Sequence, residues 1–443
     1  MAQVVPFRGV VYSPLKIQDL ADVTTPPYDV ISPEEQTAFY NHHPQNIIRL
    51  ILGKTFETDT DTDNRYTRSA AFFNDWLAKG ILVQDTTPCI YLTSTEFSIH
   101  SQIFTRWGLI AQVALEPFEK GVVLPHEKTF SHVKSERLEL MKSCHANFSP
   151  IFSLYSDPAQ TIVDMLRLSV SGQTPDMTFT DTTNCKHRLW RVSDPMVHQK
   201  VSAAMSPTSL FIADGHHRYE TALNYRQWVA DTTPGFSPKH PANFIMMYLC
   251  AMEDPGLVIL PAHRILKAGN SQKVETLIDA ADAFCTIQRI AIDPASGMPI
   301  DGQSWETVLN TTDSETRIGV VIRHHGEACC LTPKPGVMQQ LFGAEMTGAM
   351  LELDVTVLTR LLLMELLGLD SRQLDREGVI AYSSRIETAL EAVCSGDGDA
   401  AFILNPTRID QVKRIAESGE TMPRKSTYFY PKVITGQVIN HLM

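Results

Sequence analysis

The sequence has 443 residues, of which 43% are hydrophobic and 20% are charged, the composition of an ordinary folded protein. Its formal net charge of −12 argues against a general nucleic-acid binder, which needs a basic face. At roughly 100–200 residues per domain, the length predicts two or three structural units.

Several features predict a cytoplasmic location. The first residues, MAQVVPFRGVVYSPLK, carry an arginine and prolines where a signal peptide needs an uninterrupted apolar stretch. No window reaches the roughly 18 apolar residues of a membrane span, so we expect no membrane partner. The eight cysteines form no CxxC pair, which indicates reduced, mostly buried thiols and no structural zinc.

The first 155 residues predict a mixture of helices and strands. Ser32, followed by Pro33 and then by Glu35, has the pattern of a helix N-cap with a capping box. A second helix is expected to end at Gly80. The alternating segments CIYLTSTEFSI and RWGLIAQVAL are typical of strands.

The rest of the chain continues this α/β pattern. A helix at AQTIVDMLRLSV and a strand at HRLWRV are predicted before residue 206, and a hairpin is predicted in RIGVVIRHHGEACCLTP. The segment LDVTVLTRLLLMELLGLD is too short for a membrane span and is expected to be a core or interface helix. We predict an N-terminal α/β region over 1–266, a second α/β unit over 267–400, and a C-terminal strand–helix–loop over 401–443 that packs back on the core.

The stretch FIADGHHRYETAL, residues 211–223, predicts a buried strand that turns directly into a helix. Such a turn exposes unpaired helix N–H groups at the strand's carboxyl end, which is an anion-binding arrangement. Gly215 permits a positive φ or a close backbone approach to a ligand. Arg218 lies in the first turn of this helix, where the helix dipole makes a positive charge slightly unfavourable. An anion such as phosphate bound nearby would offset that cost through charge-assisted hydrogen bonds.

The residues around Gly215 allow a catalytic and a purely structural interpretation. In the catalytic one, Asp214 is a general base or a Mg²⁺ ligand, His216 assists catalysis, and His217 and Arg218 contact phosphate. In the structural one, Asp214 is a cap and the histidines are a surface pair. Spacing alone leaves both open. Adjacent histidines on a helix face apart, so they are not two ligands of one metal.

The motif DGHHRYETA resembles the G-x-H-R strand–helix element of the ParB–sulfiredoxin superfamily. That resemblance implies a mixed-sheet core and nucleotide phosphates bound at the turn. Some members are kinases of free serine with an Asp-Gly-His version of the motif. On this likeness Asp214 would activate a hydroxyl, with Gly215, His216 and Arg218 at the phosphate.

A broader resemblance spans most of the chain. The stretches PFRGVVYSP, PPYDVIS, HEKTFSHVKSERLELM, ANFSPIFSLY, IADGHHRYETAL, LPAHRIL and MPRKSTYFYPKVITG resemble, in order, the signatures of a bacterial and archaeal family known as domain of unknown function 1015. The family implies no established activity.

The stretch PHEKTFSHVKSER (125–137) is another candidate. It is not a zincin motif, because its histidines are six residues apart. His126 and Glu127 are candidates for acid–base roles, Glu127 also for Mg²⁺, and Arg137 for a substrate carboxylate or phosphate. The alternative is a solvated helix start.

Three further stretches carry candidates. In MPRKSTYFYPK, Lys425, Ser426, Thr427 and Lys432 could cradle phosphates, or the stretch could be a strand with Phe429 buried and solvated lysines. Two shorter stretches supply candidates for substrate binding, with turn chemistry or a core histidine as the alternatives: Tyr28 and Asp29 in PPYDVIS, and His263 and Arg264 in PAHRIL.

No Walker A motif, dinucleotide-binding glycine fingerprint or G-x-S-x-G elbow occurs. The sequence therefore predicts a mixed α/β protein that uses ATP or ADP with Mg²⁺ to phosphorylate a small hydroxylated metabolite, such as serine or a related hydroxy acid. The alternative is a regulatory or scaffolding protein that binds a phosphate or nucleotide without turnover.

Overall fold

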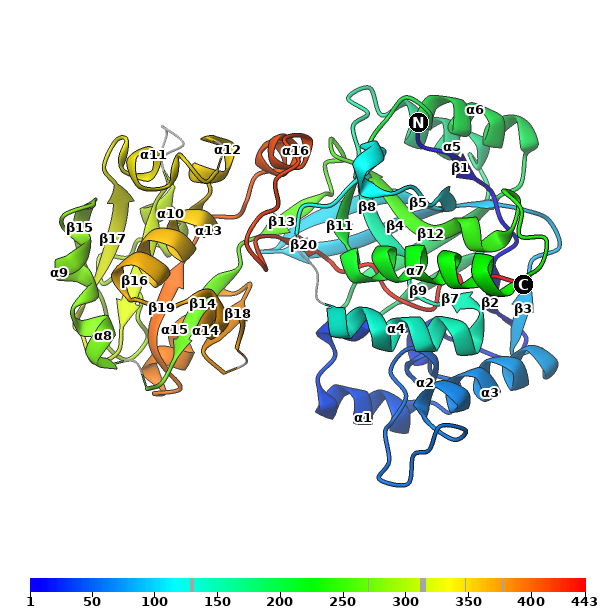
Figure 1. Cartoon of the computed structure of the whole chain (residues 1–443), viewed down its shortest axis with the longest axis horizontal. Coiled ribbons are helices and arrows are strands. Elements are labelled where there is room, and N and C mark those ends of the chain that lie inside the picture. Colours follow the sequence, from blue (N-terminus) through cyan, green and yellow to red (C-terminus); the bar gives the residue numbers. More distant parts are fainter. Residues whose placement is uncertain (128–130, 270, 311–315, 347, 377) are drawn as a thin grey trace. The chain divides into compact units, whose positions relative to one another are not determined.

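The computed structural model describes residues 1–127, 131–269, 271–310, 316–346, 348–376 and 378–443 (Figure 1). The chain forms two compact units. Unit 1 comprises Met1–Pro125, Thr129–Val258 and Pro431–Met443, and unit 2 comprises His126–Lys128 and Ile259–Tyr430. Both units combine helices with β-sheet, which confirms the mixed α/β class with a second α/β unit. The sequence-based division at 1–266, 267–400 and 401–443 stays a prediction, since compactness does not show which segment folds alone.

The main sheet of unit 1 has nine strands within the described part of the chain, in the order β6-β11-β8-β12-β5-β4-β10-β9, with β1 beside β5. The sheet is mixed, because β11 pairs with β6 and β12 pairs with β8 in parallel while the other pairs are antiparallel. The strands are β1 (Val4–Val5), β4 (Ile90–Ile99), β5 (Gln102–Ala114), β6 (Val123–Leu124), β8 (Ile151–Tyr155), β9 (Met177–Thr180), β10 (Lys186–Val192), β11 (Leu210–Asp214) and β12 (Phe244–Ala251).

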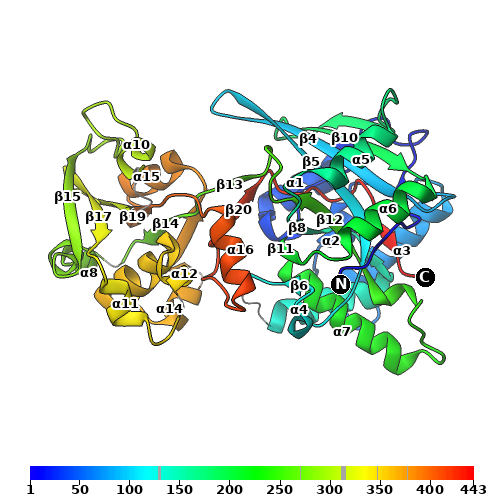
Figure 2. The same cartoon turned by 90° about the horizontal axis from the view of Figure 1, so that it is seen from above.

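Three of the described helices of unit 1 pack against this sheet. The α-helices of unit 1 are α1 (Pro33–His42), α2 (Ile48–Ile51), α3 (Arg65–Ala78), α4 (Ser131–Cys144), α5 (Thr161–Ser169), α6 (Pro195–Met205) and α7 (His216–Thr232). The 3₁₀ helices are η1 (Leu20–Asp22), η2 (Tyr28–Val30), η3 (Phe118–Lys120) and η4 (Pro241–Asn243). Side chains of α5, α6 and α7 share one apolar core with the sheet. Helices α4 and α7 lie side by side (Figures 1 and 2).

The C-terminal segment Pro431–Met443 is part of unit 1. Its strand β21 (Asn440–His441) pairs with β7 (Ala146–Asn147), and Thr435 bridges to Thr25. Ile439 bridges to Val10 in β2 (Val10–Tyr12), whose own partner is β3 (Leu82–Gln84). These pairings hold the last residues of the chain against its first.

Two helix boundaries in unit 1 agree with the local sequence. The Ser32 hydroxyl accepts from the Glu35 N–H at 3.2 Å while the Glu35 carboxylate accepts from the Ser32 N–H at 2.8 Å, so the predicted capping box is confirmed. Helix α3 ends at Ala78, and Gly80 adopts a φ of 64°, as expected for a glycine that closes a helix.

Unit 2 is built on an antiparallel sheet with the strand order β15-β17-β16-β19-β14-β18. Its strands are β14 (His263–Lys267), β15 (Cys285–Ala291), β16 (Ile318–Ile322), β17 (Glu327–Pro333), β18 (Ile380–Ser383) and β19 (Gly398–Ile403), with β13 (Val258–Leu260) and β20 (Tyr428–Tyr430) forming a separate pair. Strands β16 and β17 confirm the predicted hairpin. The α-helices are α8 (Ser271–Glu275), α9 (Leu277–Ala281), α10 (Trp305–Leu309), α11 (Val337–Phe342), α12 (Gly348–Leu351), α13 (Asp354–Thr356), α14 (Ser371–Asp375), α15 (Ile386–Cys394) and α16 (Ile409–Glu417).

The apolar segment predicted as a core or interface helix lies in the core of unit 2. It forms α13 and then a π-helix, η5 (Val357–Leu366), in which Leu358, Leu361 and Leu362 are fully buried. Within the described residues, no helix is both long enough and apolar enough to cross a membrane.

Candidate functional site

The turn between β11 and α7 has the predicted geometry. Strand β11 ends at Asp214, Gly215 has a φ of 98°, and α7 begins at His216. A side chain at 215 would be strained in this conformation, because the region is populated almost only by glycine. The helix buries Tyr225 and Val229, which are four residues apart and therefore lie on one face that packs within unit 1.

Asp214 lies between two cations. The Lys432 ammonium donates to its Oδ1 at 2.6 Å, and the Arg218 guanidinium forms an ion pair with its Oδ2. The side chains of Asp214, Lys432 and Arg218 are only 14%, 14% and 11% exposed, respectively. Arg218 also donates to the carbonyl oxygen of Pro150. The turn therefore carries a largely buried cluster with more positive than negative charge.

This cluster keeps Asp214 ionised. Burial opposes the charged form of the carboxyl, but the attraction of Lys432 and Arg218, with His216 nearby, outweighs burial. The result is a pKa of Asp214 well below its usual range. A carboxylate of such low basicity accepts a proton reluctantly.

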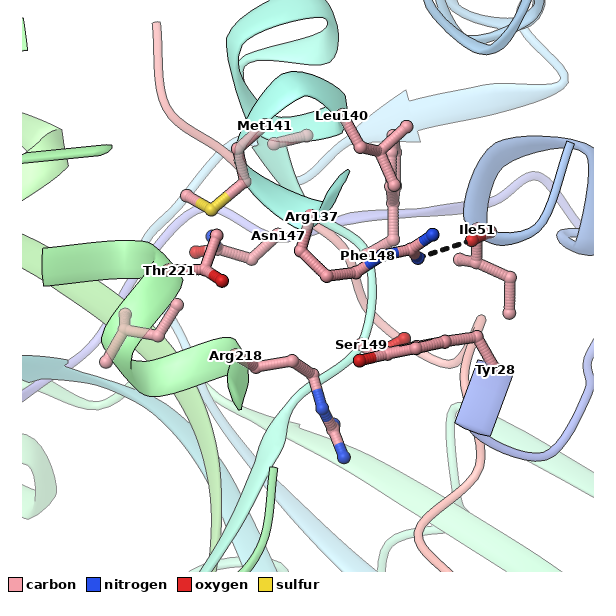
Figure 3. Close-up of a pocket in the computed structure, with 12 residues that line it drawn as sticks. Tyr28, Ile51, Arg137, Leu140, Met141, Asn147, Phe148, Ser149, Arg218 and Thr221 are labelled. Atoms are coloured by element: carbon pink, nitrogen blue, oxygen red, sulfur yellow. Dashed lines mark hydrogen bonds between the residues drawn. The ribbon is translucent and has the colours of Figure 1, made fainter. Parts of the chain in front are cut away.

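A cavity of about 50 Å³ lies beside Arg218. Figure 3 shows that α4 contributes Arg137, Leu140 and Met141 to its lining, while α7 contributes Arg218 and Thr221. The remaining lining residues are Tyr28, Ile51, Ala146, Asn147, Phe148, Ser149 and Ile245. Helix α7 thus takes part both in this cavity and in the charged cluster around Asp214.

Arg137 is held firmly at the wall of the cavity. It is 6% exposed, donates to the Ile51 carbonyl oxygen at 2.7 Å and pairs with Glu136. Its guanidinium carbon lies 4.1 Å from the centre of the Tyr28 ring. Burial and the neighbouring Asp29 raise the pKa of Tyr28 to about 12, although Arg137 and Arg218 act in the opposite direction. Tyr28 therefore stays a neutral phenol at physiological pH.

Other sequence-predicted residues occupy unit 2. His126 is buried and its Nε2 lies 3.1 Å from the Thr427 hydroxyl. The Ser426 hydroxyl donates to the Pro423 carbonyl oxygen. Buried Arg264 donates to the carbonyl oxygens of Arg424 and Lys425, and burial lowers its pKa to about 10. Glu127 lies close enough to Arg264 to influence that pKa.

His263 is a core residue. Its Nδ1 accepts from the Leu404 N–H at 3.1 Å, and burial, with the neighbouring Arg264, lowers its pKa to about 4. The ring is neutral at pH 7, which agrees with the interpretation of PAHRIL as a strand with a core histidine.

The structure thus separates the predicted site residues into groups. The first group lies at the turn between β11 and α7 and consists of Asp214, Gly215, His216 and Arg218, with Lys432 paired to Asp214. The second group lines the neighbouring cavity and consists of Tyr28 and Arg137, together with Arg218. Asp29 and Lys425 are exposed, whereas His217 is half-buried. In MPRKSTYFYPK, residues 428–430 form a strand with Phe429 buried, and Lys432 is engaged by Asp214 rather than solvated.

A Mg²⁺ ion bound by the protein alone does not fit this turn. Mg²⁺ prefers octahedral oxygen ligands, whereas both oxygens of Asp214 already accept from cations. Across the part of the chain that the structure describes, no three His, Cys, Asp or Glu side chains cluster as metal ligands.

Sequence analysis missed the polar lining of the cavity, Asn147, Ser149 and Thr221. Thr221 lies three residues after Arg218, and side chains at that spacing share a helix face, so it could have been found. Asn147 ends β7 and Ser149 lies in the short link from β7 to β8, and nothing local to them indicates a cavity.

Comparison with known proteins identifies the family. The family model described as "Protein of unknown function (DUF1015)" matches residues 4–356. The chain belongs to this family. No curated protein matches it.

Several solved structures are similar to this member of the DUF1015 family. A conserved hypothetical protein from Pyrococcus furiosus has 13% identity and a TM-score of 0.36, with 75% of this chain and 97% of that one covered. A free serine kinase in complex with AMP has 13% identity and a TM-score of 0.35, covering 75% and 91%. SbnI with a C-terminal truncation from Staphylococcus aureus has 9% identity and a TM-score of 0.34, covering 74% and 86%. Similarity at these values does not bear on activity.

Proposed function

We propose that this protein is a nucleotide-dependent phosphotransferase that acts on a small hydroxylated metabolite, with the Asp214 turn as the site of phosphoryl transfer. The observation that carries the proposal is the meeting of Lys432 and Arg218 on Asp214 at the start of α7. Phosphoryl transfer requires mainly positioning and neutralisation of charge. Two cations and the amino end of a 17-residue helix supply that neutralisation.

In this proposal the two cations change partners during the reaction. The transferred phosphoryl group competes with Asp214 for Lys432 and Arg218, because phosphate oxygens are strong acceptors of charge-assisted hydrogen bonds. Asp214, relieved of part of this attraction, becomes more basic and orients the acceptor hydroxyl. The hydroxyl oxygen forms a bond to phosphorus, the bond to the leaving nucleotide breaks, and the hydroxyl proton passes to Asp214.

The size of the cavity limits what binds there. At about 50 Å³ it is far smaller than the 300–1,000 Å³ of ordinary ligand pockets. The nucleoside therefore lies outside it, and only the phosphates approach the turn. Mg²⁺ would enter with the ATP or ADP phosphates. The resemblance of residues 214–218 to the Asp-Gly-His element of free serine kinases makes serine and related hydroxy acids the first substrates to test.

The test is a transfer assay by ³¹P NMR with ATP or ADP, MgCl₂ and a panel of small hydroxy acids. Asp214→Asn should abolish transfer but retain nucleotide binding, since it leaves both cations in place. Arg218→Ala should weaken nucleotide binding. Its control is Arg226→Ala on the same helix, where the arginine donates to the Leu115 carbonyl oxygen instead. Unchanged transfer in Asp214→Asn would refute the role of Asp214.

The same assay tests the alternative function. Nucleotide binding that depends on Arg218 without any transfer would favour a regulatory or scaffolding protein. The observation favouring this alternative is that both oxygens of Asp214 are already engaged in the structure.

A further inference from the structure

The cavity beside Arg218 contains two buried polar atoms that are not satisfied. Thr221 is 1% exposed and Arg137 is 6% exposed. Among the described residues, neither the Thr221 Oγ1 nor the Arg137 Nε has a hydrogen-bond partner. Both residues line the cavity, from α7 and α4 respectively (Figure 3). Buried polar groups are nearly always paired, so two unpaired donors in one cavity indicate a ligand that accepts hydrogen bonds.

Two other polar groups of the lining are already engaged. The Ser149 hydroxyl bonds to the Thr435 hydroxyl at 2.8 Å, and the Asn147 Oδ1 accepts from the Asn440 side chain at 2.8 Å. The C-terminal segment thus occupies these two groups and leaves the donors of Arg137 and Thr221 for a ligand.

The charge around the cavity favours an anion. Arg137 and Arg218 both line the cavity, and the charges of both guanidinium groups act to lower the pKa of Tyr28. The two acids that pair with these arginines also pair with cations outside the cavity lining, Glu136 with Arg65 at 3.0 Å and Asp214 with Lys432. A third acid, Asp29 beside Tyr28, is exposed to solvent. The volume of about 50 Å³ accommodates a small planar anion or a few water molecules.

We propose that this cavity binds the carboxylate of the acceptor substrate through the Arg137 Nε–H and the Thr221 hydroxyl, which makes the substrate a short hydroxy acid. The inference rests on the proposed phosphotransferase function. Arg218 borders the cavity and also contacts Asp214. A short acid anchored by its carboxylate therefore extends its hydroxyl towards the turn where phosphoryl transfer is proposed.

Thr221→Val gives the sharpest test, because valine has the shape of threonine without the hydroxyl. Removing an unpaired buried hydroxyl should leave the thermal stability of the ligand-free protein unchanged or raise it. The same substitution should weaken hydroxy-acid binding roughly 10-fold, the loss of one hydrogen bond to a charged group. The matched control is Thr356→Val in unit 2, whose buried hydroxyl also has no partner among the described residues.

Binding is measured on the full-length protein by calorimetric titration with glycolate, L-lactate, D-glycerate and L-serine. Ethanolamine, which is serine without its carboxylate, should not bind. ADP binding should be unchanged in Thr221→Val. Arg137→Lys, which keeps the charge but lacks the Nε–H, should also weaken acid binding.

Two results would overturn the carboxylate site. One is that none of the four acids binds the unaltered protein, which would mean that the cavity holds only water. The other is that Thr221→Val binds them as tightly as the unaltered protein. A different result would contradict the proposed function and leave the carboxylate site standing. In that case acid binding would depend on Thr221, but the unaltered protein would transfer no phosphoryl group from either ATP or ADP.

Discussion

Replacing Lys432 by methionine tests whether the C-terminal segment stabilises the charged turn. The Lys432 ammonium lies 2.6 Å from Asp214, and both side chains are 14% exposed. Breaking a buried ion pair by removing one partner costs about 3–5 kcal/mol, because a charge is left buried and uncompensated. Arg218 still faces Asp214 in the variant, so we expect the lower end, about 3 kcal/mol.

Lys79→Met provides the matched control. Lys79 pairs with Asp75 at a similar distance, 2.9 Å, but the two side chains are 64% and 47% exposed. An exposed helical pair of this kind contributes about 0.3–0.5 kcal/mol. The contrast between the two variants therefore isolates burial, since both remove a lysine from an aspartate.

Urea unfolding followed by tryptophan fluorescence measures both variants. Four of the five tryptophans lie in unit 1, at positions 76, 107, 190 and 228, so the signal reports mainly on the unit that contains Lys432. Adding Asp214→Asn to Lys432→Met should not recover the loss, because the largely buried Arg218 then loses its carboxylate partner. Equal losses in Lys432→Met and Lys79→Met would refute the argument.

The pH dependence gives a second check on the same pair. The pKa of Asp214 is depressed in the folded protein, so its stabilisation is fully present above the unfolded value near pH 4 and is lost as the pH falls towards the folded value. Lys432→Met should raise the folded pKa. The difference in stability between the unaltered protein and the variant should therefore be constant from pH 8 to 5 and shrink below about pH 4. A difference that grows in acid would contradict the assigned direction.

Three further predictions concern other parts of the chain. Gly215→Ala should cost about 1–3 kcal/mol by urea unfolding, more than Gly80→Ala, because a Cβ at 215 would lie 2.9 Å from the Arg218 guanidinium whereas at 80 it meets open space. Burial raises the pKa of Asp354 from 3.8 to about 6, so Asp354→Asn should stabilise the protein by about 3 kcal/mol at pH 8. The gain should vanish as the pH falls from 6 to 4, where the folded aspartate becomes protonated, and a gain independent of pH would contradict this. Seven of the eight cysteines are buried and Cys394 is exposed, so a thiol reagent should label one site in the native protein and none in Cys394→Ser.

The sequence by itself determined the local geometry of the central turn. The apolar run before Asp214, the glycine at 215 and the helical spacing after it predicted strand β11 and helix α7. The capping box at Ser32 and the helix end at Gly80 were equally accessible. These features depend on residues within about four positions of one another, and hydrogen-bond geometry at that range is nearly independent of the rest of the chain.

Only the tertiary structure decided which distant residues join that turn. Lys432 was predicted as part of a phosphate-binding loop, yet nothing in its surroundings indicated that it meets Asp214, 218 residues earlier in the chain. The same holds for Arg137 against the Tyr28 ring and for the cavity that they share with Thr221. Such contacts arise when the C-terminal segment pairs with β7 and when α4 packs beside α7. Burial makes it costly to leave these charges unpaired, and burial is a property of the packed unit that no short stretch of sequence reveals.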